Sequence, residues 1–277
     1  MQAKEHSLAL QLQHVVNAYK YLDRRRGLDP KNSFSALLAS KPHLDAEIAF
    51  NPEPWSKLIQ TQARLFDVKP LMQISDRLRR EFHEGHAPGR VMPEIARQDW
   101  ATDLLDQYAC GPIGYDLPCL LSAERPARGR IMMCAQDPLR GPGAAKLTVG
   151  TFFGIDDNHL RARRHYWMIW QFIRRCVLTG YDVWVTDAIK VFAGKGVVQR
   201  NRSLRELSRS IIEAEVAAFA PDRIVTFGKL AGETMADISG NHAFISLQHP
   251  TAHGQRGSFK DRVGIYMQAV LGEACPH

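Results

Sequence analysis

An apolar run that stops abruptly at polar and turn-forming residues sets the strongest limit on the fold of this chain. Residues 131–135 are apolar, and Gln136, Asp137 and Pro138 follow directly. A run of this length, bounded by turn residues, predicts a buried β-strand. An acidic residue at the end of such a strand lies where open α/β sheets carry their functional sites. Asp-Pro is also a common turn starter, so the pair alone does not establish a site.

From residue 130 onward, predicted strands and helices alternate. The strands cover residues 131–135, 181–186, 223–227 and 243–247, and the helices cover 163–178, 203–219, 230–238 and 259–271. Ser203 and Glu206 have the spacing of a capping box at the start of the second helix. This alternation predicts a parallel sheet with helices on both faces. We therefore expect an α/β fold with three layers, αβα, around a four-stranded parallel sheet.

The first part of the chain has a helical pattern instead. Apolar residues recur at three- and four-residue steps, as at Leu8, Leu12, Val15, Tyr19 and Leu22. Further helical patterns cover residues 33–40, 54–66, 70–84 and 92–108. No Ser/Gly-rich tether follows them. We expect an N-terminal helical extension, residues 1–110, packed on an α/β domain of residues 111–277.

Charge and cysteine content narrow the class of protein. The formal net charge is +7, and arginines cluster at 24–26, 161–164 and 200–205, which favours a polyanionic partner. The five cysteines are widely spaced and form no C-x-x-C pair, which argues against a zinc or iron–sulfur site. Buried thiols in a reducing cytoplasm fit better.

No apolar run is long enough to span a membrane, and the first six residues lack the apolar core of a signal peptide. We expect a cytoplasmic protein.

Polar residues follow all four predicted strands. They are Asp137, Asp187, the pair Gly228-Lys229, and His249. Right-handed crossovers bring the carboxyl ends of parallel strands to one edge of the sheet. Two acids and a histidine at one edge are what a site for charge-developing chemistry requires.

These strand ends resemble the motifs of the uracil-DNA glycosylase superfamily. Ala135-Gln136-Asp137-Pro138 followed by Gly141-Pro142-Gly143 is similar to the family's first motif, Gly-Gln-Asp-Pro with a Gly-Pro-Gly loop. His249-Pro250-Thr251 is similar to its last motif, His-Pro-Ser. The strands that end at Asp187 and at Gly228-Lys229 resemble the two motifs between them. The resemblance covers residues 128–273.

The resemblance implies a monofunctional DNA glycosylase, without metal or cofactor, that removes uracil or another deaminated base in base-excision repair. It gives Asp137 the role of stabilising the sugar cation and orienting water, and His249 that of stabilising the departing base with help from the Gln136 amide. Phe152 or Phe153 stacks on the flipped base. The residues expected to contact the DNA, mainly at its backbone phosphates, are Gly141, Gly143, Lys229, Thr251, His253 and Arg256. The sequence has no evident pattern of a dimer interface, so we expect a monomer. The expected partner is single- or double-stranded DNA.

Three departures from the family pattern affect specificity. Asp187 replaces the base-pairing Asn, and an ionised Asp only accepts hydrogen bonds, so it suits a base edge with donors. A purine that carries N1–H fits, as does the N4 amine of cytosine with a protonated Asp187, and Lys190 could restore a donor. Leu139 replaces the Tyr that excludes thymine. Residues 251–256 lack the usual apolar wedge, though His253 or Arg256 could stack or reach a phosphate.

Two rival functions remain open. The first is a non-catalytic nucleic-acid-binding protein with a glycosylase fold, which the replacement at Asp187 and the altered wedge motivate. The second is a metal-dependent phosphoesterase that uses Asp137, Asp187, His249 and His253, although no local signature supports that ligand spacing.

Overall fold

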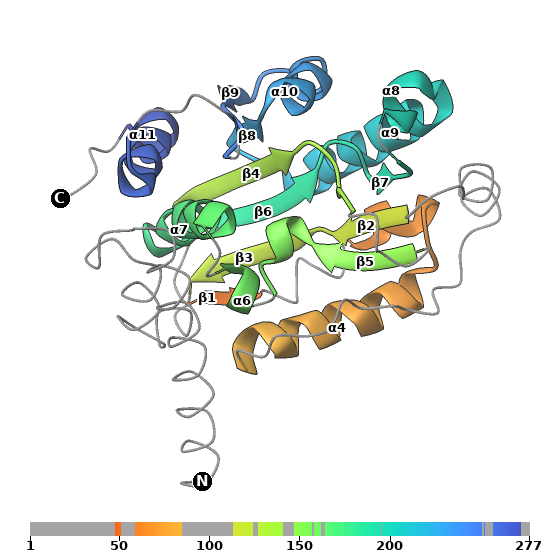
Figure 1. Cartoon of the computed structure of the whole chain (residues 1–277), viewed down its shortest axis with the longest axis horizontal. Helices are drawn as coiled ribbons and strands as arrows, with labels where there is room; N and C mark the ends of the chain where they lie inside the picture. The colour runs from red at the N-terminus through yellow and green to blue at the C-terminus, as the bar shows by residue number, and fades with distance from the viewer. Residues whose placement is uncertain are drawn as a thin grey trace, which may run out of the picture.

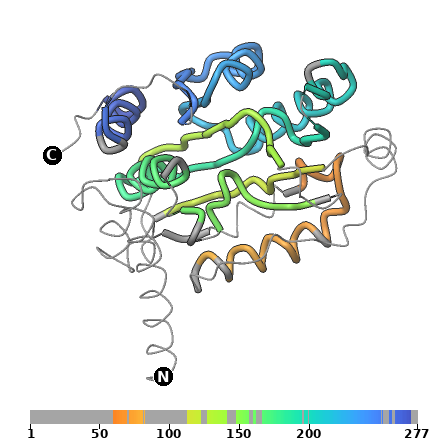
Figure 2. Tube along the Cα trace, viewed as in Figure 1, coloured from red at the N-terminus to blue at the C-terminus, as the bar shows by residue number. Residues whose placement is uncertain are grey.

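The computed structural model describes residues 48–50, 59–84, 113–123, 127–140, 147–156, 158–161, 164–194, 196–250, 252 and 257–272. Figure 1 shows the arrangement of helices and strands, and Figure 2 traces the same backbone as a tube. The helices predicted near residues 8–22, 33–40 and 92–108 lie outside the described residues.

The main sheet has six strands in the order β1-β3-β6-β4-β8-β9. Their bounds are β1 Ile48–Phe50, β3 Cys119–Ala123, β4 Gly129–Ala135, β6 Tyr181–Asp187, β8 Arg223–Phe227 and β9 Ala243–Leu247. The strands β6, β4, β8 and β9 run parallel, whereas β3 is antiparallel to β6 and β1 is antiparallel to β3. The fold is mixed α/β, as expected. The sheet is not the predicted sheet of four parallel strands, because β3 and β1 extend it beyond β6 through two antiparallel pairings.

Helices cover both faces of the parallel strands. Ile131 and Met133 of β4 pack with α7 (Arg164–Leu178) and α11 (Phe259–Leu271). Met132 and Cys134 pack on the other face with α9 (Arg202–Phe219) and α10 (Lys229–Ala236). Both faces of β4 are therefore buried, which explains why its sequence is a continuous apolar run rather than an alternating one.

A second, smaller sheet lies beside the first (Figure 1). It has the order β5-β2-β7, with β2 Ile113–Leu117, β5 Leu147–Thr151 and β7 Val191–Phe192. Strand β2 is parallel to β5 and antiparallel to β7. Pro118 separates β2 from β3, so the chain changes sheets at a residue that has no N–H to donate to a ladder.

Elements from the predicted N-terminal extension contact both sheets: one is a strand of the main sheet, and others pack against the small sheet. Strand β1 pairs with β3, so this extension is not purely helical as we expected. Helical periodicity could not indicate this, because the partner strand lies about seventy residues further along the chain. Leu65 and Phe66, which directly follow the 3₁₀ helix η1 (Ile59–Arg64), and the helix α4 (Val68–Glu84) share a hydrophobic cluster with β2 and Val149 of β5. The domain boundary near residue 110 stays a prediction.

The predicted helix ends are close to the observed ones. Helix α11 begins after Ser258, which forms a capping box with Asp261. Helix α9 is capped by Asn201, whose side chain accepts from the Leu204 N–H at 2.8 Å. The capping box predicted at Ser203 is therefore wrong, because Asn201 caps the helix first. In the described part of the chain, no helix combines the length and apolar character needed to cross a membrane.

Candidate active site at the carboxyl edge of the parallel strands

The ends of β4 and β6 are tied together by backbone hydrogen bonds. Asp187, the last residue of β6, is in register with Ala135, the last residue of β4. Beyond these ends, the Ala188 N–H donates to the Ala135 carbonyl at 2.9 Å and the Ile189 N–H donates to the Gln136 carbonyl at 3.0 Å. The segment that carries Asp137 is thus held beside Asp187 by the main chain itself.

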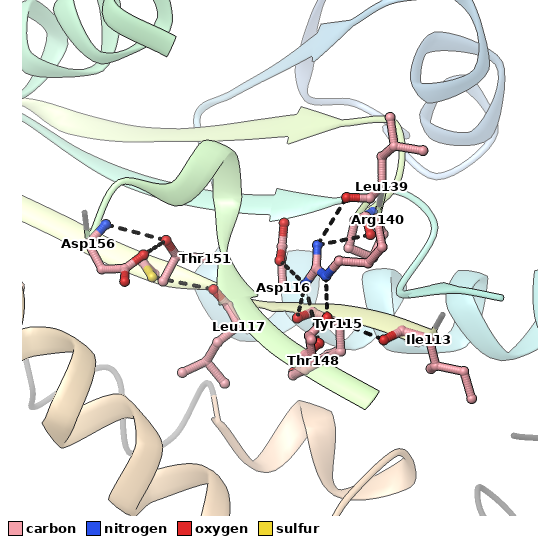
Figure 3. A network of polar contacts seen from close by, with 11 residues as sticks. Ile113, Tyr115, Asp116, Leu117, Leu139, Arg140, Thr148, Thr151 and Asp156 are labelled. Carbon is pink, nitrogen blue, oxygen red and sulfur yellow. Dashed lines mark hydrogen bonds and ion pairs between the residues drawn. The ribbon is translucent and has the colours of Figure 1, made fainter. Parts of the chain in front are cut away.

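Arg140 holds the loop that follows Asp137 (Figure 3). Its guanidinium donates to the Pro138 carbonyl at 3.0 Å and to Thr148 Oγ1 at 2.6 Å. It also donates to the Tyr115 carbonyl at 2.9 Å and forms a largely buried ion pair with Asp116 at 2.7 Å. These contacts join the loop to strands β2 and β5 and set the direction in which Asp137 leaves β4.

Sequence reasoning missed both Arg140 and Asp116. Arg140 lies within the predicted motif loop, so an arginine beside the acid was a signal that could have been used. Asp116 lies in β2, between the buried residues Tyr115 and Leu117. An alternating pattern of this kind could have revealed the strand, but nothing local shows that its polar residue pairs with Arg140.

Strand β2 must come very close to this loop. A Cβ built at Gly114 would lie 2.4 Å from the Pro138 carbonyl oxygen and 2.7 Å from Arg140 Cγ. Only glycine leaves room for the loop to lie on the strand at this point.

The carboxyl groups at this edge are electrostatically linked. Burial raises the pKa of Asp137, and the charge of Asp116 raises it further. Burial also raises the pKa of Asp187 well above its ordinary value; Asp116 and Asp137 add to this effect, while Lys190 and Arg140 oppose it. Asp187 is only 4% exposed, and its Oδ2 has no hydrogen-bond partner. Such an orphan in a buried position calls for an explanation.

The turn after β5 distinguishes the two candidate aromatic residues. Phe152 is 0% exposed and packs in the main core near Phe227. Phe153 is half-buried and has the left-handed backbone conformation φ 50°, ψ 20°. The side chains of Thr151 and Asp156 are hydrogen-bonded across this turn (Figure 3). The structure therefore favours Phe153 over Phe152 as the ring available for stacking.

His249 lies at the same edge, one strand beyond β8. Its ring centroid is 5.7 Å from that of Phe153, at an interplanar angle of 34°. Tyr266 of α11 donates its hydroxyl to the Gln248 carbonyl at 2.5 Å, which fixes the residue before His249. Because β8 lies between β4 and β9, the strand ends that carry Asp137 and His249 are about 10 Å apart.

The other predicted site residues are divided between exposed and undescribed positions. Leu139 is 69% exposed, and its side chain points away from the Arg140 guanidinium, which donates to the Leu139 carbonyl at 3.3 Å (Figure 3). Lys229 is exposed at the start of α10, 3.6 Å from Glu233. Five predicted DNA contacts lie outside the described residues: Gly141, Gly143, Thr251, His253 and Arg256.

Lys190 is engaged elsewhere. Its side chain is 1% exposed, and its ammonium group donates to Glu215 Oε1 at 2.5 Å and to the Thr186 hydroxyl. Glu215 also accepts from Gln62 at 2.5 Å and from the Trp184 indole N–H at 3.2 Å. The structure therefore does not support Lys190 as a hydrogen-bond donor to a base, because its donors are directed into this buried network.

A groove adjoins the site on the side of α9 and α10. It has a volume of ≈ 490 Å³. Its lining combines Arg202, Arg205, Arg209, Glu206 and Asp237 with Thr234 and the apolar residues Ile189, Val198 and Leu230. The predicted arginine cluster around residue 202 thus lies close to the strand ends, although Arg202 is paired with Glu206 and Arg209 with Glu213.

Among the described residues, no group of three or more His, Cys, Asp or Glu side chains is arranged to hold a metal ion. No protein-family model matches the chain, and no curated protein matches its sequence.

Proposed function

We propose that this protein is a DNA glycosylase that hydrolyses the N-glycosidic bond of a flipped-out uracil or other deaminated base. The observation that best supports the proposal is the contact between Phe153 and His249. Their ring centroids lie 5.7 Å apart, although the two residues follow different strands. Asp137 follows a strand of the same sheet edge. A stacking ring, a donor and a carboxylate are the three groups that base removal requires.

In this proposal, charge develops in two places during bond cleavage. The sugar becomes cationic, and the Asp137 carboxylate stabilises it and orients the attacking water. The departing base becomes anionic, and His249 stabilises it by donating a hydrogen bond. Burial and the charge of Asp116 raise the pKa of Asp137, which moves its ionisation toward neutral pH, where a general base is most effective.

The test is base release from oligonucleotides that carry uracil, hypoxanthine, xanthine or mismatched thymine, single- and double-stranded, with a chelator present. Asp137→Asn is expected to lower release by about 10²–10⁴-fold, and His249→Ala by about 10²–10³-fold, while DNA binding survives. Asp182→Asn is the matched control, because burial also raises the pKa of Asp182 but it lies at the opposite end of β6. Unchanged release in both site variants would contradict the proposal.

One observation favours a second candidate function, a nucleic-acid-binding protein without catalysis. The position of the family's base-pairing Asn is occupied by the buried Asp187, whose Oδ2 has no partner. Binding to a modified base without formation of an abasic product would support this alternative. Full base release in the presence of the chelator would exclude the metal-dependent phosphoesterase.

A further inference from the structure

The donor groups of Arg140 are all engaged within its own loop and the small sheet (Figure 3). Its Nε donates to Thr148 Oγ1 at 2.6 Å, and its Nη1 donates to two carbonyl oxygens of the loop at 3.0 and 3.3 Å. Its Nη2 donates to Asp116 Oδ1 at 2.7 Å and to the carbonyls of Tyr115 and Thr148 at 2.9 and 3.3 Å. A guanidinium group has five N–H donors in a fixed fork, so this arrangement leaves none for another acceptor.

Asp137 lies only three residues before Arg140, and yet the two side chains are not paired. In the described part of the chain, the Asp137 carboxyl group has no hydrogen bond or ion pair, whereas Arg140 is paired with Asp116. An adjacent cation favours the ionised form of a carboxyl group and so makes it a weaker base. An Asp137 paired with Arg140 would also be less free to orient a water molecule.

We propose that Asp116 is a positioning residue that neutralises Arg140, so that the arginine holds the loop without pairing with Asp137. This inference rests on the proposed function and assigns it a further residue. The side chains of Asp116 and Arg140 are 11% and 6% exposed. Removing one member of such a pair leaves the other charge uncompensated. Asp137 and Asp187 are then the carboxyl groups available to replace Asp116.

The inference predicts a definite change in pH dependence. Burial raises the pKa of Asp137, and the charge of Asp116 raises it further. A neutral residue in place of Asp116 removes that charge and leaves Arg140 uncompensated, and both changes lower the pKa of Asp137. The increase of base release with pH is therefore expected at lower pH. The titratable and charged groups around Asp137 come from β2, β4, the loop itself and the ends of β6 and β9: Tyr115 and Asp116, Cys134, Arg140, Asp187 and Lys190, and His249.

The first experiment follows the carboxyl groups without substrate. The protein is labelled with ¹³C at the aspartate carboxyl carbons, and the signals of Asp137 and Asp187 are assigned by their absence in Asp137→Asn and Asp187→Asn. Asp116→Asn keeps the shape of the side chain and is expected to lower the pH at which the Asp137 signal titrates. An unchanged titration, or a change at Asp187 alone, would overturn the inference. This result does not depend on catalysis, whereas absence of base release from every substrate would contradict the proposed function.

The second experiment measures base release as a function of pH. Asp116→Asn is expected to lower the plateau about ten- to a hundredfold and to move the increase to lower pH. Asp116→Glu keeps the charge and is expected to keep the increase in place. Thr148→Val is the matched control, because it removes a hydrogen bond of Arg140 without changing a charge. It is expected to lower the plateau without moving the increase, and equal shifts in Thr148→Val and Asp116→Asn would count against the neutralising role.

The third experiment removes both charges. When Arg140→Gln is added to Asp116→Asn, the titration of Asp137 is expected to return toward that of the unmodified protein. If Asp116→Asn alone does not fold, a folded double variant would support the inference, because the uncompensated charge is then the cause of the failure. A double variant that does not fold, or in which the titration of Asp137 stays lowered, would overturn it.

Discussion

At the scale of single residues, Phe153 has the most unusual conformation in the candidate site. Its φ of 50° lies in the left-handed region, which costs a non-glycine residue about 1–3 kcal/mol. The turn holds it there through Thr151 and Asp156, and its ring contacts those of Tyr166 and His249. Strain of this kind is commonly retained where a side chain must be presented to a ligand.

Phe153→Ala is expected to weaken binding of DNA with a flipped base by about 1–3 kcal/mol, the contribution of one base stacked on an aromatic ring. The measurement is a binding titration with the catalytically inactive Asp137→Asn background. Phe152→Leu is the control, because Phe152 is buried in the core and its replacement is expected to change stability rather than binding. Equal weakening by the two replacements would contradict the assignment of stacking to Phe153.

At the scale of elements, the contact between β2 and the loop of residues 138–140 positions the candidate catalytic acid. Three features create it: the absence of a side chain at Gly114, the ion pair between Asp116 and Arg140, and the hydrogen bond from Arg140 to Thr148 of β5. The small sheet therefore has a role beyond packing, because it supports the loop that begins at Asp137.

Gly114→Ala is expected to push this loop away from β2, since the new Cβ would lie 2.4 Å from a backbone oxygen. Overpacking of this kind typically costs about 1–3 kcal/mol. Urea unfolding and base release measure the two consequences, and both are expected to decrease. Gly232→Ala is the comparison, because there the nearest atom, 3.0 Å away, is the end of the Ser246 side chain. Full activity in Gly114→Ala would show that the loop does not depend on this contact.

At the scale of the whole molecule, the buried pair of Lys190 and Glu215 links distant parts of the chain. Gln62 of η1, Trp184 of β6 and Glu215 of α9 meet in one network, and Tyr115 of β2 donates to Gln62 at 2.8 Å. The network joins the small sheet to the large one beneath the candidate site. Its charges compensate each other, so removing one of them is more harmful than removing both.

Glu215→Gln is expected to destabilise the protein by about 3–5 kcal/mol, because it leaves the Lys190 ammonium group buried without its partner. The double replacement Glu215→Gln with Lys190→Met is expected to be less destabilised than Glu215→Gln alone. Denaturant unfolding measures both. Glu206→Gln, which breaks the exposed pair with Arg202, is the control and is expected to have little effect. Additive losses in the double variant would contradict this account.

Much of the parallel core could be predicted from the sequence. The observed bounds of β8, β9 and α11 agree with the predicted ranges, and β4, β6, α7 and α9 differ by one or two residues at an end. The three strands of the small sheet, β2, β5 and β7, and the strands β1 and β3 of the main sheet were missed. They are short, and their pairing depends on partners far along the chain, so local periodicity is a weak guide to them; β2 alone has an alternating pattern that could have indicated it.

In the candidate site, too, some features follow from local sequence patterns and others only from the tertiary structure. Local patterns, namely an apolar run followed by a polar or turn-forming residue, are enough to place Asp137, Asp187 and His249 at strand ends, because strand formation and termination depend on a few neighbouring residues. Only the tertiary structure selects Phe153 over Phe152, pairs Arg140 with Asp116 and buries Asp187 without a counter-ion. These properties depend on burial and on charges contributed by distant segments, which raise the pKa of Asp187 only once the chain has folded.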